Sequence, residues 1–374
     1  MVKKELRYST SICVTHKCNL HCRYCYQHHS MEMMSMETAK KVIDNIFELK
    51  PQQFTGIDIG FIGGEPLLAF DLIKEVCEYT WSKYANENFI FYASTNGTIL
   101  TNEMKNWFSA YDKKFILGLS LDGIRETHNF NRSNSFDLID IDFFREHWPK
   151  QGVKMTLSEF SLENLADNII YLHSLGFKIT GANLAEGYIG WNKECFLTSI
   201  SRELKKLERY YIDNPDIEPC PFLNKKLMWC DMKRGKFKYC GIGNGANFYD
   251  VDGTMYPCPY VTPMTFTEKQ LEQINKMDFT DIDNFVDDYC YNNCYLYPIC
   301  SSCAGDNYLS TGIFNKRKYD KCGIIKLASL YTADLMGKKI IQKSINLSES
   351  ELYHTINAIK QIAHLYKQQF SIYI

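Results

Sequence analysis

The distribution of cysteine is the sequence feature that most constrains this chain. Fifteen cysteines occur among 374 residues, and seven of them fall in two short segments, three within residues 18–25 and four within residues 290–303. Cysteines used only for packing would be scattered, as Cys77 and Cys195 are. An odd number of cysteines in a reducing compartment points away from disulfides and toward metal binding or catalysis. We therefore expect a fold organised around metal-binding thiols.

The first 185 residues alternate short β-rich runs with stretches of helical periodicity. Strands are expected over 10–15, 56–62, 89–94, 115–121, 153–157 and 178–184, with helices over 36–49, 70–84, 102–111, 138–148 and 162–175. Successive βα units predict a parallel sheet, and the unusual residues follow the strand ends. TIM barrels and open α/β sheets both place their active sites at the carboxyl ends of the strands. An arc of six parallel strands fits both, so we expect an α/β fold, a partial (β/α)6 barrel of TIM type.

The βα pattern stops near residue 190. A basic helix over 193–211, interpreted as a solvated face, leads to a connector at 214–221 that contains three prolines. The segment 240–322 is rich in loops, so we expect it to be held by metal, and 324–370 returns to helical periodicity. The predicted domains are 1–213, a loop-rich iron–sulfur domain with its connector at 214–325, and C-terminal helices at 326–374.

The charge balance excludes some classes of partner. Lys and Arg total 42 against 44 Asp and Glu, so a net charge of −2 gives no general attraction to nucleic acid or to an anionic membrane. No run of 18 apolar residues predicts a membrane span. The first residues lack the apolar core of a secretory signal, so the expected location is cytoplasmic.

Cys18, Cys22 and Cys25, in a C-x3-C-x2-C loop, follow the first expected strand. Three soft thiolates suit an iron–sulfur cluster, which normally takes four ligands, so one iron would stay open to a small molecule. The alternative is zinc, which prefers four protein ligands in a closed tetrahedral site.

This loop, followed by the aromatic Tyr26, resembles that of the radical S-adenosylmethionine (SAM) enzymes. The resemblance implies that the three cysteines hold a [4Fe–4S] cluster and that the amine and carboxylate of S-adenosylmethionine bind its fourth iron. Reduction of the bound cofactor then yields a 5′-deoxyadenosyl radical, which abstracts hydrogen from the substrate. Tyr26 is carried over as a residue at the cofactor.

Further cofactor-binding residues are expected at the ends of the next three strands. The Gly-Gly-Glu-Pro loop resembles the family's loop for the cofactor's amine, which implies roles for Gly63, Gly64 and Glu65. Asp122 and Ser120 resemble contacts to the ribose or carboxylate, Asn96 is a comparable candidate, and Arg132 offers a guanidinium to the carboxylate. The alternative for Asp122-Gly123 is a plain turn, and His128 is interpreted as a structural histidine.

The later cysteines resemble the SPASM extension of radical enzymes that modify peptides or proteins, which carries two auxiliary [4Fe–4S] clusters. The resemblance assigns Cys240, Cys258 and Cys303 to a nearer cluster, with Cys230 preferred over Cys220 or an open iron as the fourth ligand. The farther cluster would take the remaining four: Cys290, Cys294, Cys300 and Cys322. The family's four-cysteine segment usually reads C-x2-C-x5-C-x3-C, whereas the first and last spacings are exchanged in this chain. The alternative interpretation of these cysteines is a pair of zinc knots. Cys13, Cys77 and Cys195 are expected to be ordinary buried thiols.

The layout also resembles the anaerobic sulfatase-maturating enzymes, which oxidise a Ser or Cys to formylglycine. Those enzymes carry an Asp base directly after the cysteine equivalent to Cys258, where this chain has Pro259. We therefore favour maturation of a ribosomal peptide, by thioether or carbon–carbon crosslinking or by epimerisation, with formylglycine formation as the alternative. An electron carrier with several clusters or a zinc-stabilised interaction protein are alternatives of other classes. The expected partners are a peptide or protein substrate, a separate leader-recognition protein, and an electron donor of the flavodoxin or ferredoxin type.

Overall fold

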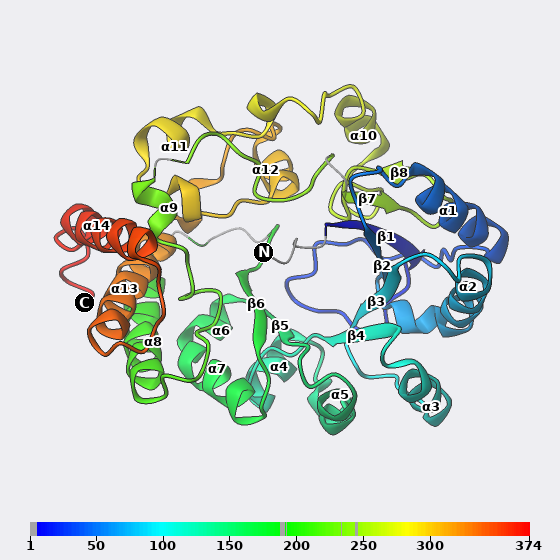
Figure 1. The fold of residues 1–374 in the computed structure, drawn as a ribbon, viewed down its shortest axis with the longest axis horizontal. Coiled ribbons are helices and arrows are strands. Elements are labelled where there is room, and N and C mark those ends of the chain that lie inside the picture. The colour runs from blue at the N-terminus through cyan, green and yellow to red at the C-terminus, as the bar shows by residue number, and fades with distance from the viewer. Residues whose placement is uncertain (1–5, 188–190, 192, 233, 244–245) are drawn as a thin grey trace. The chain divides into compact units, whose positions relative to one another are not determined.

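The computed structural model describes residues 6–187, 191, 193–232, 234–243 and 246–374 (Figure 1). Two compact units form within it, and each is assembled from separate stretches of the chain. Unit 1 comprises Met1–Ser120, Arg132–Gln151 and Cys240–Asp281, and unit 2 comprises Leu121–Asn131, Gly152–Tyr239 and Ile282–Ile374.

Unit 1 contains a six-stranded sheet of order β4-β3-β2-β1-β7-β8. Its strands are β1 (Arg7–Thr15), β2 (Gly56–Gly63), β3 (Phe89–Thr95), β4 (Phe115–Leu119), β7 (Ala246–Tyr249) and β8 (Met255–Tyr256). The first four run parallel in sequence order, β7 runs parallel to β1, and only β8 is antiparallel to its neighbour. This mostly parallel sheet confirms the expected α/β class and places the loops after β1, β2 and β3 at one edge.

Helices follow the strands of unit 1 as expected: α1 (Met36–Leu49), α2 (Phe70–Lys83), α3 (Asn102–Tyr111) and α5 (Ile141–His147). The bounds of α1 match the prediction because Ser35 caps the helix, its side chain accepting a hydrogen bond from the Thr38 amide. The apolar stripe of α1 is buried: Ala39, Val42, Ile43 and Ile46. Unit 1 also contains η1 (Pro66–Ala69), η2 (Phe136–Leu138) and α10 (Glu268–Ile274).

In unit 2, β5 (Val153–Leu157) and β6 (Ile179–Leu184) form a separate parallel pair. The helix expected over 162–175 is divided into α6 (Glu159–Glu163) and α7 (Leu165–Ser174), since Asn164 leaves the helical conformation. The chain between β4 and β5 also forms α4 (Arg125–Asn131), a helix too short for its periodicity to be recognised.

Three long helices of unit 2 pack together: α8 (Glu194–Asp213), α13 (Cys322–Ile341) and α14 (Glu349–Tyr366) (Figure 1). Helix α8 buries one stripe, which includes Phe196, Ile200 and Leu204. Cys195 lies off this stripe and is exposed, so the expectation that it is buried is wrong, whereas Cys13 and Cys77 are buried as expected. No helix among the described residues is long and apolar enough to cross a membrane.

Short elements make up much of the rest of unit 2, including the part of the expected loop-rich segment 240–322 that lies in this unit. They are α9 (Met228–Asp231), η3 (Ile282–Asn284), α11 (Asp288–Asn293), η4 (Tyr297–Ile299), α12 (Ala304–Thr311) and η5 (Tyr319–Lys321). A small core around Val286, Cys290 and Tyr297 lies between them.

Candidate metal and cofactor site

The loop between β1 and α1 gathers the three cysteines of the C-x3-C-x2-C motif in unit 1. The Cys25 amide donates to the Cys22 carbonyl at 3.0 Å, and the Leu20 amide points at Cys18 Sγ at 3.5 Å. Burial raises the pKa of the Cys18 thiol, and the nearby Cys25 and Glu65 charges add to the effect. None of the three cysteines forms a disulfide. The loop thus presents three soft ligands from adjacent turns.

The loop after β2 packs directly against this cysteine loop. The Gly64 amide donates to the Thr15 carbonyl at 3.1 Å, and the Glu65 amide donates to the Lys17 carbonyl at 2.8 Å. A Cβ on Gly64 would lie 2.3 Å from the Lys17 carbonyl oxygen and 2.9 Å from Cys18 Cβ. Only glycine therefore fits at this position, and its small size lets the two loops meet.

Glu65 is 1% exposed, and its carboxylate joins the ends of β2 and β3. The carboxylate accepts hydrogen bonds from Thr95 Oγ1 at 2.7 Å, the Asn96 amide at 2.8 Å and the Leu67 amide at 3.1 Å. Burial raises the pKa of this carboxyl group, and the same three hydrogen bonds act in the opposite direction. The Glu65 side chain therefore holds the loop after β2 to the end of β3. Its carboxylate oxygens are already used in these hydrogen bonds, so the backbone groups of the loop are better suited to bind a ligand.

Asn96 and Arg132 complete the group of predicted residues that unit 1 brings together. Asn96 Nδ2 donates to Asn19 Oδ1 at 2.9 Å, so the loop after β3 contacts the cysteine loop. The Arg132 guanidinium is largely buried, lies 5.4 Å from the centre of the Tyr24 ring, and opposes the upward pKa shift of the Cys25 thiol. Asn19 was not among the predicted residues, although its place between two of the clustered cysteines is a signal that could have identified it.

Two further predicted residues, Ser120 and Tyr26, also belong to unit 1. The Ser120 amide donates to the Thr95 carbonyl at 3.0 Å, which extends the pairing beyond β4. Tyr26 stacks on Tyr260 with ring centres 4.2 Å apart. Ser133, which follows Arg132 in the chain, has φ of 56° and accepts a hydrogen bond from the His21 amide at 2.9 Å. A serine in this conformation indicates local strain beside the cysteine loop.

Asp122 belongs to unit 2, where its carboxylate is completely buried. It accepts hydrogen bonds from the Thr156 amide at 3.0 Å and from Asn131 Nδ2 at 3.2 Å, and the Asp122 amide donates to His128 Nδ1 at 3.3 Å. The carboxylate therefore holds β5 and α4 together. Its predicted role at the cofactor stays a prediction.

The residues gathered in unit 1 fit a three-cysteine iron–sulfur site with a small-molecule ligand. The three cysteines lie in one loop, a buried guanidinium lies beside Cys25, and the tight loop after β2 approaches Cys18. A guanidinium fits a carboxylate well, and three thiolates leave a cubane iron without a protein ligand. The same loop also offers an imidazole, since His29 Nε2 lies 3.7 Å from Cys25 Sγ, so a zinc site of three thiols and one histidine is the alternative that the donor set allows.

The auxiliary cysteines divide between the two units. In unit 1, burial raises the pKa of Cys258 to about 11, and the neighbouring Cys240 contributes. In unit 2, Cys290 and Cys322, both predicted for the farther cluster, each have the other two predicted ligands, Cys294 and Cys300, as charged neighbours. Burial raises the pKa of the Cys290 thiol to about 12.

Cys230, predicted for the nearer cluster, has Cys294 and Cys300 as its electrostatic neighbours. It therefore lies beside the farther set within unit 2. Its assignment to the nearer cluster, like that of Cys303, which caps α12, stays a prediction.

A buried cation accompanies the farther set. Arg317 Nη1 donates to the Cys300 carbonyl at 3.0 Å, and its guanidinium is 8% exposed. The carboxylate of Asp287 accepts from the amides of Cys290 and Arg317, both at 2.9 Å. A buried cation next to several thiols is favourable when those thiols are ionised, as metal binding requires. The donor set therefore fits a thiolate-bound cluster, although sequence reasoning did not identify Arg317.

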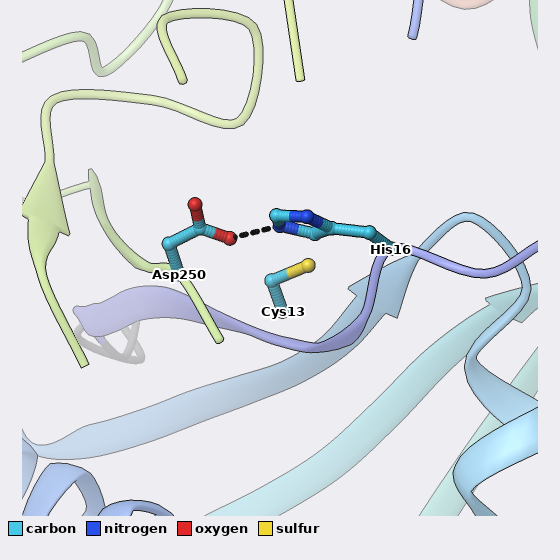
Figure 2. Close-up of side chains that lie close together, drawn as sticks. All are labelled: Cys13, His16 and Asp250. Atoms are coloured by element: carbon cyan, nitrogen blue, oxygen red, sulfur yellow. Dashed lines mark hydrogen bonds and ion pairs between the residues drawn. The ribbon is translucent and has the colours of Figure 1, made fainter. Parts of the chain in front are cut away.

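A second polar group of unit 1 joins β1 to the chain after β7 (Figure 2). His16 Nε2 lies 2.6 Å from Asp250 Oδ1, and His16 Nδ1 lies 2.8 Å from Glu32 Oε2. Cys13 completes a trio whose candidate ligand atoms all lie within 4.8 Å of one another. Because both ring nitrogens of His16 already contact carboxylates, we interpret the trio as a buried hydrogen-bonded link between strands.

Three comparisons relate the chain to known proteins. The model of the Radical SAM superfamily matches residues 12–200, half of the chain. A cysteine-type anaerobic sulfatase-maturating enzyme of Clostridium novyi is 25% identical over 343 residues, covering 76% of this chain and 84% of the relative. The antilisterial bacteriocin subtilosin biosynthesis protein AlbA of Bacillus subtilis is 26% identical over 183 residues, 47% of this chain and 39% of AlbA. The fold resembles that of native anSMEcpe with bound AdoMet and the Cp18Cys peptide, with a TM-score of 0.66, 18% identity, and coverage of 90% and 99% of the two chains.

Proposed function

The chain belongs to the radical SAM superfamily, and from this we propose that it is an enzyme that abstracts hydrogen from a residue of a ribosomally made peptide. The observation that supports the proposal is the packing of the cysteine loop against the loops after β2 and β3, with the buried Arg132 beside Cys25. The sulfatase-maturating relative acts on a protein and AlbA acts in bacteriocin biosynthesis, which supports a peptide or protein substrate.

Particular residues would hold the cofactors. Cys18, Cys22 and Cys25 would bind a [4Fe–4S] cluster, and Arg132 would receive the carboxylate of S-adenosylmethionine. With electrons from a donor, the bound pair supplies a 5′-deoxyadenosyl radical that removes hydrogen from the substrate. Gly64 keeps the β2 loop against the cysteine loop, and Glu65 fixes that loop to the end of β3, so both hold the site in shape.

Two auxiliary clusters complete the proposal. The nearer would be bound by Cys240, Cys258 and Cys303 with Cys230, and the farther by Cys290, Cys294, Cys300 and Cys322. Arg317 would offset the negative charge of the farther thiolates. Their role would be to accept an electron from the substrate radical or to hold a substrate sulfur.

The residue after Cys258 favours a peptide crosslink or an epimerisation over formylglycine formation. Formylglycine formation needs a base, and the expected carboxylate position holds Pro259, whose ring can neither accept nor donate a proton. The sulfatase-maturating activity thus remains the second candidate, supported by the similarity to the Clostridium novyi enzyme.

The test measures iron, sulfide and zinc per chain after anaerobic reconstitution, in the wild type and in the Cys18, Cys22, Cys25→Ala variant. We expect about 12 iron in the wild type and about four fewer in the variant, since each cubane holds four. The same samples are incubated with S-adenosylmethionine and dithionite, and only the wild type should release 5′-deoxyadenosine. About two zinc and no iron would contradict the enzyme, and about eight iron would contradict one auxiliary cluster.

A further inference from the structure

A basic, aromatic surface lies beside the farther cysteine set in unit 2. Among the described residues of the segment 225–238, the exposed cations are Lys226 and Arg234. At its centre is Trp229, with Lys226 Nζ 5.1 Å and the Arg234 guanidinium carbon 4.6 Å from the ring centre. The Arg234 guanidinium also lies 3.9 Å from the Phe237 ring centre. We call this the Trp229 surface: Lys226, Trp229, Met232, Arg234 and Phe237.

The cations of the Trp229 surface differ in how much of their charge is available to a partner. Lys236, its neighbour in sequence, pairs with Asp283 at 2.7 Å and with Asp288 at 3.0 Å, so its charge is neutralised locally. Lys226 and Arg234 are exposed; Arg234 stacks on the rings of Trp229 and Phe237, whereas Lys226 also has the Glu351 carboxylate nearby. Stacking holds the guanidinium in place without cancelling its charge.

A cavity of about 470 Å³ connects this surface to the cysteines. Arg234 lines it together with Cys230 and Cys294, and residues of α14 such as Leu365 form part of the wall. Cys294 belongs to the predicted farther cluster, and Cys230 lies beside it. A molecule seated on the Trp229 surface would therefore come close to the thiols of that cluster.

Exposed apolar side chains accompany the cations. Met232 is 50% exposed and Leu365 is 41% exposed. Methionine, arginine and aromatic residues are enriched at protein interfaces, and a small interface steered by charge is typical of transient redox partners.

From these observations we propose that the Trp229 surface docks an acidic, one-electron redox protein that reduces the farther cluster. The proposal rests on the proposed function, because it needs that cluster. In each encounter one electron leaves the partner's reduced cofactor and enters the oxidised farther cluster, so that accepting an electron from the substrate radical falls to the nearer cluster. For a flavodoxin, the anionic hydroquinone becomes the neutral semiquinone, so no proton is transferred. An acidic peptide would fit the same charges, but the cysteines in the cavity wall favour a redox partner.

The experiment uses the reconstituted full-length protein and follows the bleaching of its iron–sulfur absorbance in a stopped-flow instrument. The reductants are flavodoxin hydroquinone and, separately, dithionite, which is small enough not to need a docking surface. The variants are Lys226→Glu/Arg234→Glu and, as a matched control, Lys205→Glu on an exposed face of α8. Iron content is measured for every sample.

We expect reversal of both charges to slow reduction by flavodoxin about tenfold at low salt, and to leave dithionite reduction within about twofold. Raising the salt to about 0.3 M should slow the reduction of the wild type by flavodoxin and have little effect on the double variant. Salt screens the attraction between opposite charges, and the double variant already lacks that attraction. The Lys205→Glu control should behave as the wild type.

An equal flavodoxin rate in wild type and double variant, or an equal loss in the Lys205→Glu control, would overturn the docking proposal. So would binding of a fluorescent poly-glutamate peptide that is lost in the double variant while the flavodoxin rate is unchanged. A wild type that takes up no iron would instead contradict the proposed function, and the two failures are thereby distinguished.

Discussion

At the scale of single residues, the closest packing in the candidate site occurs at Gly64. A Cβ there would lie 2.3 Å from the Lys17 carbonyl oxygen, and backbone atoms cannot rotate away as a side chain can. We expect Gly64→Ala to displace the cysteine loop and to lower the iron content by about four per chain, the content of one cubane. Gly181→Ala is the matched control, because its nearest neighbour would lie at 3.6 Å. Full iron content in Gly64→Ala would show that the loops can separate without loss of the site.

The buried carboxylate of Glu65 makes a second prediction at this scale. Its removal leaves the Asn96 and Leu67 amides and the Thr95 hydroxyl without their acceptor. We expect Glu65→Ala to lower the free energy of unfolding by about 2–4 kcal/mol in urea titrations of the metal-free protein. Glu48→Ala, on the exposed face of α1, should change it by less than about 0.5 kcal/mol. Equal effects of the two substitutions would refute the bracing role of Glu65.

At the scale of elements, His16 joins β1 to the segment that contains β7 and β8. Asp250 is buried and hydrogen-bonded to His16, so its removal leaves the histidine facing Glu32 alone. We expect Asp250→Ala to cost about 3–5 kcal/mol of unfolding free energy and to speed amide exchange in β7. Asp252→Ala, in the adjacent turn, is the control. Protection of β7 at the wild-type level would show that the backbone pairing with β1 suffices.

The contact between α8 and α13 makes stability depend on pH. Burial raises the pKa of Glu208 to about 7, the hydrogen bond to Asp334 adds to this, and Lys338 and Tyr331 are the other titratable groups facing it. Because the folded pKa exceeds the unfolded value, this contribution to stability is complete below about pH 4.5 and is lost as the pH rises through about 7. The melting temperature should therefore fall between pH 5.5 and pH 8, and less so in Glu208→Gln. An unchanged pH profile in this variant, with exposed Glu146→Gln as the control, would exclude Glu208 as its source.

At the scale of the whole molecule, local patterns predicted the βα elements well and long-range pairing poorly. The stripe of α1 and its Ser35 cap identify that helix to the residue, because both signals lie within the helix itself. The pairing of β7 with β1 joins Ser9 to Ala246, which are far apart in the sequence. The periodic spacing of apolar residues within one strand cannot predict which distant strand pairs with it. Likewise, Arg317 looks like an ordinary surface arginine in the sequence, and only the fold brings it to the Cys300 carbonyl.

The stability of the segment 282–322 should depend on metal. Its helices are short, and its core around Val286, Cys290 and Tyr297 is small, whereas the sheet of unit 1 has its own buried strands. Metal binding to such a segment is coupled to its folding. We therefore expect chelation of iron to increase amide hydrogen exchange in 282–322 strongly and in β1–β4 weakly. The Cys18, Cys22, Cys25→Ala variant should keep 282–322 protected, because it retains the auxiliary cysteines. Exchange that is unaffected by chelation would mean that the aromatic core and Arg317 hold this segment without a cluster.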